Sequence, residues 1–213
     1  MRNSTKKRIL RRLRSKGRGI VFVTKDVIDL GNRDAVDQAL SRLATDGTIR
    51  RIAHGVYDFP KIHKRLGPLT PDPDSVARAL ARKNGCRLQV SGARAANFLG
   101  LSTQVPAKTV YLTDGPTRSV RVLVGNQVIQ FQHRSPRCFA GAGKASGTVL
   151  QALRYLGPGG VTKQVVDKLR DSLSQQDRDG LRDLLPLAPI WAQAAIHQIS
   201  EQTTAGGEHS WTA

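Results

Sequence analysis

Residues 47–60 have the sequence GTIRRIAHGVYDFP, in which two short β-rich runs flank an Ala-His-Gly turn. Gly55 suits the left-handed position of a short hairpin loop, and Pro60 ends the second run. Two arginines and a histidine make the hairpin basic. By itself such a hairpin fits an ordinary surface turn as well as a DNA-gripping wing, so the surrounding elements decide between the two.

The elements that precede the hairpin follow from polar caps and apolar periodicity. A basic helix that begins after Ser4 is followed by a β-branched strand at residues 20–23. A short helix at 25–30 ends at Gly31, and Asn32 caps a longer helix with apolar residues at helical spacing. Helix, strand, helix, turn, helix and hairpin is the order of a winged helix-turn-helix, a module of about 60 residues.

The rest of the chain predicts an α+β protein. The segment KIHKRLGPLTPDPDS after the hairpin has three prolines in a polar stretch, which is typical of a linker. Three β-rich runs and then short helices follow, so we expect a mixed α/β domain with a small antiparallel sheet and a helical C-terminal tail. The predicted domains are an N-terminal winged helix-turn-helix at 1–67, a linker at 68–74, an α+β domain at 75–201 and a disordered tail at 202–213.

Charge is distributed unevenly along the chain. The formal net charge is +18, with +11 in residues 1–67, +8 in residues 68–149 and −1 in the remainder. A field of this sign attracts polyanions, so double-stranded DNA is the expected partner. The nearly neutral final third is better suited to packing or protein contacts.

Membrane, secretory and metal-binding signatures are lacking in the sequence. No run approaches the roughly 20 apolar residues of a membrane span, and charged residues interrupt the N-terminal segment where a signal peptide would be apolar. Cys86 and Cys138 are the only cysteines, and no metal-ligand spacing surrounds them. We expect a cytoplasmic protein that needs no membrane, no metal and no cofactor.

Catalytic side chains are also scarce. The glycine-rich FAGAGKASG fails the phosphate-loop spacing, because Cys138 and Ala145 stand where that motif needs Gly and Ser or Thr. Asp114 belongs to a turn sequence, and His133 and Cys138 have no third group to orient them. We therefore expect no catalytic residue and no enzyme activity.

The exposed side of the helix capped by Asn32 carries side chains of the types that read base edges, and the flanking elements carry groups suited to phosphates. The predicted DNA-binding residues are Thr24, Lys25, Arg33, Asp37, Gln38, Ser41, Arg42, Arg50, Arg51 and His54. A second basic surface is predicted in the following domain, from Arg78, Arg82, Arg94, Arg118 and Arg121. The alternative for the first set is a solvated helix face beside an ordinary hairpin.

Longer stretches of the chain resemble a known family. The hairpin ending RRIAHGVYDFP, the block SGARAANFLGLSTQVPAKTVYLTDGP from Ser91 to Pro116, and the runs QHRSPRCF and LQALRYLG are similar to AbiEi-type antitoxins of type IV toxin-antitoxin, or abortive infection, systems. The resemblance covers roughly residues 1–160. The Ser91–Pro116 block is its most specific part, since many winged helices share the GVY ending.

The resemblance implies two activities. One is autorepression of transcription, through binding to inverted repeats in the protein's own promoter. The other is counteraction of a nucleotidyltransferase-like toxin encoded beside it, for which no stable complex between the two proteins is thought to be needed. By motif position the resemblance assigns DNA contacts to Arg33, Gln38, Arg42, Arg50, Arg51 and His54. It assigns no catalytic residue.

Two other classes of function compete with this hypothesis. A ligand-responsive winged-helix transcription factor without a toxin partner would hold an apolar pocket with a few converging polar groups in its second domain. An enzyme acting on nucleic acid is disfavoured by the shortage of carboxylates in the middle of the chain. The gene beside this one separates the first alternative from the antitoxin.

Overall fold

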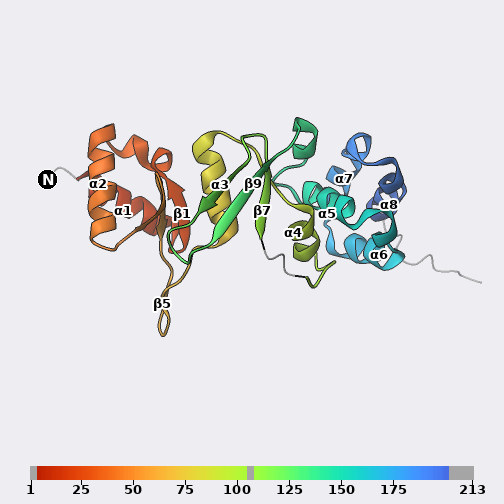
Figure 1. Ribbon diagram of the computed structural model, residues 1–213, viewed down its shortest axis with the longest axis horizontal. Coiled ribbons are helices and arrows are strands. Elements are labelled where there is room, and N and C mark those ends of the chain that lie inside the picture. Colours follow the sequence, from red (N-terminus) through yellow and green to blue (C-terminus); the bar gives the residue numbers. More distant parts are fainter. Residues whose placement is uncertain (1–3, 105–107, 202–213) are drawn as a thin grey trace, which may run out of the picture. The chain divides into compact units, whose positions relative to one another are not determined.

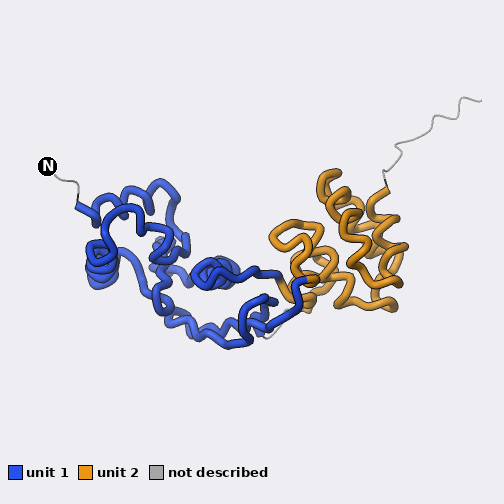
Figure 2. Tube along the Cα trace, turned by 90° about the horizontal axis from the view of Figure 1, so that it is seen from above, with its two compact units in different colours: residues 1–89, 106–136 blue, residues 90–105, 137–213 orange. Residues whose placement is uncertain are grey.

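The computed structural model describes residues 4–104 and 108–201. The chain is an α+β protein, as predicted, and it packs into two compact units (Figure 2). Unit 1 comprises residues 1–89 and 106–136, and unit 2 comprises residues 90–105 and 137–213. These two units, which are defined by internal contacts, do not coincide with the predicted domains at 1–67 and 75–201. Whether those predicted domains fold independently stays a prediction. The tail predicted at 202–213 lies outside the described residues.

Unit 1 begins with helices around a small sheet (Figure 1). The elements are α1 (Thr5–Lys16), β1 (Ile20–Val23), the 3₁₀ helix η1 (Thr24–Leu30), α2 (Arg33–Thr45), β2 (Arg50–Ala53) and β3 (Val56–Phe59). The predicted caps form: the Ser4 side chain accepts a hydrogen bond from the Lys7 amide, and that of Asn32 accepts one from the Ala35 amide. The three strands are antiparallel in the order β1-β3-β2.

One apolar core holds these elements together. Residues of α1, β1, η1, α2 and β3 contribute to it, and they are fully or almost fully removed from solvent. The core consists of Ile9, Leu13, Phe22, Val27, Val36, Ala39, Leu40, Leu43, Ile49 and Phe59. Because α2 buries Val36, Leu40 and Leu43, the opposite side of this helix faces solvent.

A two-stranded hairpin follows where the sequence predicts the start of a linker. Its strands are β4 (Ile62–His63) and β5 (Gly67–Pro68), which pair antiparallel. Gly67 has φ +68°, a left-handed conformation that favours glycine and lets the chain turn back. Local turn chemistry thus orders a segment whose prolines alone suggest a linker.

The second part of unit 1 is a helix and a four-stranded sheet. Its elements are α3 (Pro73–Asn84), β6 (Leu88–Val90, of which Val90 belongs to unit 2), β7 (Thr109–Thr113), β8 (Arg118–Arg121) and β9 (Val128–His133). The strand order is β6-β7-β9-β8, with β8 antiparallel and β7 parallel to β9. The sheet is therefore mixed rather than wholly antiparallel as predicted.

The position of β9 explains this difference. β9 buries Ile129 and Phe131, so it takes a central place, whereas β8 has exposed Arg121 and remains at the edge, where charge is tolerated. A turn at Gly125 and Asn126 joins the two strands as a hairpin. Insertion of β9 beside β7 then makes those two strands parallel.

Unit 2 is helical, in agreement with the predicted helical tail. Its helices are α4 (Gly92–Phe98), α5 (Ala145–Gly160), α6 (Lys163–Ser172), α7 (Gln175–Arg182) and α8 (Ile190–Ser200), with the 3₁₀ turns η2 (Pro136–Phe139) before α5 and η3 (Leu185–Leu187) before α8. The core of unit 2 includes Leu150, Leu153, Leu169, Leu181 and Ile196. Within residues 4–104 and 108–201, no helix has the length and apolar character needed to cross a membrane.

Candidate nucleic-acid interface

The exposed side of α2 carries five of the predicted DNA-binding residues. They are Arg33, Asp37, Gln38, Ser41 and Arg42, and all five are exposed. Arg33 Nε donates a 2.7 Å hydrogen bond to Asp37 Oδ2, one turn further along the helix. Because both side chains are largely exposed, this pair is weak and exchanges readily for another partner. The helix therefore presents a polar face with hydrogen-bond donors and acceptors.

Thr24 and Lys25 lie at the start of η1, which contacts α2. Lys25 is exposed and Thr24 is half-buried. The structure thus places both residues in the element that precedes α2, as expected for groups that flank a helix.

Arg50 and Arg51 are neighbours in β2 with different surroundings. Arg50 forms two hydrogen bonds to Asp58, of 3.1 Å from Nε and 2.5 Å from Nη2, and its Nη2 also donates to the Leu69 carbonyl at 2.6 Å. Asp58 is only 1% exposed, so the charge of Arg50 is matched inside the fold. Arg51 is exposed. Of this pair, Arg51 is the side chain whose charge is accessible to a partner.

The turn between β2 and β3 contacts α3. Lys83 Nζ lies 3.3 Å from His54 Nδ1 and also donates to the His54 carbonyl. Gly55 has φ +63°, and a Cβ there would lie 3.4 Å from Lys83 Cε. Beside this turn, the amide of Leu123 donates a 3.0 Å hydrogen bond to the Ile52 carbonyl. The hairpin that the sequence presents as a free wing is therefore covered on one side.

Several cations meet at this turn. Burial lowers the pKa of Lys83, and the positive charges of Arg118 and Arg51 lower it further. The turn therefore concentrates positive charge on this side of unit 1. Sequence reasoning missed Lys83, and its place in the last turn of α3 is a weak signal, because basic residues are common there.

The residues of the predicted second basic surface belong to both units. Arg78, Arg82, Arg118 and Arg121 belong to unit 1, whereas Arg94 belongs to unit 2 and stacks over Phe98. Arg82 donates to Asp26 at 3.3 Å, and Arg118 lies over the Phe131 ring at 5.4 Å. Arg78 and Arg121 are exposed. A shared surface formed by these five residues stays a prediction.

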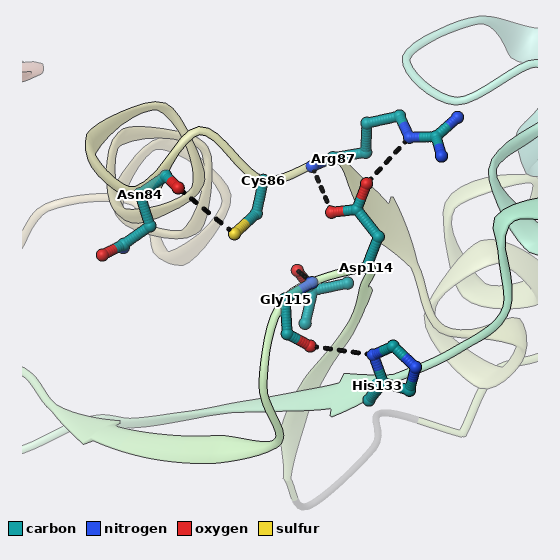
Figure 3. Close-up of polar contacts among 7 residues, drawn as sticks. Asn84, Cys86, Arg87, Asp114, Gly115 and His133 are labelled. Carbon is teal, nitrogen blue, oxygen red and sulfur yellow. Dashed lines mark hydrogen bonds and ion pairs between the residues drawn. The ribbon is translucent and has the colours of Figure 1, made fainter.

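Cys86, Asp114 and His133 each contact a neighbouring residue around the four-stranded sheet (Figure 3). Asp114 accepts from the Arg87 amide at 2.7 Å and from Arg87 Nε at 2.9 Å, and the hydrogen bond from the Arg87 side chain is the main cause of its lowered pKa. His133 Nδ1 lies 3.0 Å from the Gly115 carbonyl, and Cys86 Sγ donates to the Asn84 carbonyl at 3.5 Å. These contacts stabilise the loops around the sheet.

Other sites also bear on chemistry. His133 and Cys138, the pair considered from the sequence, belong to different units. Among residues 4–104 and 108–201, no group of three or more His, Cys, Asp or Glu side chains is arranged to hold a metal ion. Unit 2 has an open groove of about 870 Å³ between α6 and α8, lined among others by Val166, Arg170, Trp191 and Ala195.

Together these features define an α+β protein whose first unit presents an exposed polar helix face and a concentration of positive charge. Residues 8–181 match the model of a family of unknown function, DUF6088, and the chain belongs to that family. No protein with a curated description matches it. Among solved structures, it is similar to the crystal structure of the RV2827C protein from Mycobacterium tuberculosis, with 16% identity and a TM-score of 0.39 over 85% of this chain and 71% of that one.

Proposed function

We propose that residues 4–60 form a winged helix-turn-helix that binds double-stranded DNA, with α2 in the major groove. The observation that carries this proposal is the solvent-facing side of α2, where Arg33, Gln38, Ser41 and Arg42 lie opposite the buried Val36, Leu40 and Leu43. Arg suits guanine and Gln suits adenine in a groove wide enough for a helix. The net charge of +11 in residues 1–67 supplies the attraction to phosphate.

The phosphate contacts are proposed around that helix. Lys25 is exposed on η1, which contacts α2, and Arg51 is exposed on β2. His54 and Lys83 lie together at the β2–β3 turn. Arg50 is left out of the interface, because its guanidinium is held by Asp58 and the Leu69 carbonyl. Phosphate contacts set the register of the protein on the duplex, and the α2 side chains select the sequence.

The biological role that we propose is that of a transcriptional autorepressor and antitoxin. It would bind inverted repeats in its own promoter and counteract a nucleotidyltransferase-like toxin encoded beside it. The support is the resemblance of residues 91–116 and of the β2–β3 hairpin to AbiEi-type antitoxins. Co-expression with the adjacent gene tests this half of the proposal: growth should be restored only when this protein is present, and an adjacent gene that is not toxic would overturn it.

The DNA half is tested by titrating the protein against a fluorescent duplex of the DNA upstream of its gene and against a shuffled duplex. Gln38→Ala and Arg42→Ala should each weaken binding to the upstream duplex by about 1 to 3 kcal/mol, with a smaller effect on the shuffled one. Gln164→Ala, an exposed residue at the start of α6, is the matched control. Wild-type affinity of both α2 variants for the upstream duplex would show that α2 does not read the bases.

A second candidate, a ligand-responsive regulator without a toxin, is favoured by the groove between α6 and α8. Its volume of about 870 Å³ is in the range of small-molecule sites, and Trp191 lies beside the charged Arg170 and Asp167. A regulator of this kind would release the upstream duplex when a small molecule is added, and Trp191→Ala would abolish that response. A neighbouring nucleotidyltransferase gene favours the antitoxin instead.

A further inference from the structure

Residues 61–69, here called the basic hairpin, form a projecting element of unit 1. Ile62 pairs with Pro68 and His63 with Gly67, and the Leu69 amide donates to the Lys61 carbonyl at 2.8 Å. Figure 1 shows this hairpin extending away from the helices and sheets of unit 1. Three residues of extended chain reach about 10 Å, which exceeds the depth of about 7.5 Å of the DNA minor groove.

The basic hairpin is ordered at its tip and at its base. At the tip, His63 Nδ1 accepts hydrogen bonds from the amides of Arg65 and Leu66, at 3.2 and 3.3 Å. At the base, the Leu69 carbonyl accepts from Arg50 at 2.6 Å, and Asp58 holds that guanidinium. A preformed hairpin loses little conformational entropy when it binds, which raises its affinity for a partner.

Its side chains combine positive charge with exposed apolar surface. Lys61, Lys64 and Arg65 are exposed, and no acidic residue occurs between positions 59 and 71. Leu66 at the tip is 74% exposed, and Ile62 is 50% exposed. Exposed apolar side chains set among cations suit a partner that is anionic and also offers apolar surface.

We propose that the basic hairpin enters the minor groove of duplex DNA, with Lys64 and Arg65 against the phosphates and Leu66 against a base step. Minor-groove proteins use this combination of Arg and Lys with an apolar wedge such as Leu or Ile. We assign the tip to the minor groove because an apolar side chain between two basic residues and a base step is the arrangement by which minor-groove proteins unstack bases. The inference rests on the proposed DNA binding, and it adds a second contact that is independent of α2.

The test measures the salt dependence of binding to the upstream duplex for the full chain. Removal of two phosphate contacts by Lys64→Ala with Arg65→Ala should reduce the slope of log affinity against log salt by about 1.8 and weaken binding about 30-fold at about 0.15 M salt. Lys144→Ala with Lys163→Ala removes the same charge from exposed positions of unit 2 and should leave the slope unchanged. An unchanged slope for the hairpin variant would overturn the proposal.

The groove is identified with a fluorescent base analogue and a competitor. Leu66→Ala should remove the rise in 2-aminopurine fluorescence that accompanies unstacking of a base step by the wild-type protein. A drug that fills the minor groove should weaken DNA binding by the wild type but have little effect on DNA binding by the variant that carries both Lys64→Ala and Arg65→Ala. If instead a competitor that fills the major groove removes the difference in DNA affinity between these two proteins, the minor-groove assignment is refuted.

The outcomes separate this inference from the proposed function. If the hairpin variants bind like wild type while Gln38→Ala and Arg42→Ala lose their preference for the upstream duplex, the hairpin inference is wrong and the proposed function stands. If the wild type binds no duplex, both are wrong. If Leu66→Ala retains DNA binding and the 2-aminopurine signal but loses rescue from the toxin, the hairpin contacts a protein rather than DNA.

Discussion

The adjacent residues Arg50 and Arg51 should respond differently to replacement by alanine: the first substitution should lower stability and the second should lower DNA affinity. Arg50→Ala leaves the Asp58 carboxylate, 1% exposed, without its guanidinium partner, and it also removes a donor to the Leu69 carbonyl. Breaking a buried ion pair on one side costs about 3 to 5 kcal/mol. The exposed Arg51 has no such role in the fold, and Arg51→Ala should change stability by no more than about 0.5 kcal/mol.

Urea unfolding followed by circular dichroism measures this contrast. We expect the midpoint of Arg50→Ala to shift strongly to lower urea, because about 4 kcal/mol is a large part of the stability of a typical domain. The double variant Arg50→Met with Asp58→Leu should recover much of the loss, since an apolar pair leaves no unmatched buried charge. A loss below about 1 kcal/mol for Arg50→Ala would refute the structural role of the ion pair.

DNA binding should show the reverse pattern. Arg51→Ala removes one phosphate contact and should weaken binding to all duplexes about 5-fold at about 0.15 M salt. Arg50→Ala is assayed under conditions where circular dichroism shows that it is folded. It should affect DNA affinity only because Arg50 helps to hold the base of the basic hairpin. Equal weakening by the two substitutions, with equal changes in salt slope, would place Arg50 in direct contact with phosphate.

Two further predictions concern stability. The pKa of Asp114 is lowered chiefly by the Arg87 hydrogen bond, so the stability it contributes is present above the ordinary carboxyl pKa of about 3.9 and is lost as pH falls through the lowered value. Asp114→Asn should therefore cost about 1 kcal/mol at neutral pH, and the melting temperatures of the variant and the wild type should converge in acid. A difference that does not depend on pH, or an equal effect of the exposed control Asp171→Asn, would contradict this. Gly92→Ala would place a Cβ 2.5 Å from Tyr155 Cβ and 2.9 Å from the Gln151 carbonyl oxygen, so it should destabilise unit 2 by about 1 to 3 kcal/mol. The control Gly159→Ala, whose Cβ would have nothing within 4 Å, should leave the melting temperature unchanged. Equal melting temperatures for the two variants would show that α4 and α5 can move apart.

The elements with strong local signals could be predicted from the sequence. Ser4 and Asn32 cap α1 and α2 as their side-chain chemistry requires, and the apolar spacing of Val36, Leu40 and Leu43 correctly gives the buried side of α2. The exposed side follows from the buried one by helical geometry. Local hydrogen bonding and periodicity are therefore sufficient to predict the start of both helices and the side of α2 that faces solvent.

The rest depends on contacts that periodicity does not encode. The sequence does not show that Arg50 lies opposite Asp58, because that pairing depends on the register of β2 against β3. The contact of Lys83 with His54 joins residues far apart in the chain. The parallel pairing of β7 with β9 depends on which strand of the β8–β9 hairpin lies in the centre of the sheet. This position is determined by packing across the whole sheet.

The division of the chain into units has a consequence for synthesis. The polypeptide leaves unit 1 after residue 89, returns to it before Thr109 and leaves it again after residue 136 (Figure 2). Unit 1 is therefore incomplete when its N-terminal helices emerge from the ribosome, and Lys83 and Leu123 reach the β2–β3 hairpin only later. A nascent chain that stops near residue 70 presents that hairpin bare, whereas a chain released after residue 136 presents it covered. The surface around this hairpin in a ribosome-bound fragment is thus different from that of the finished protein.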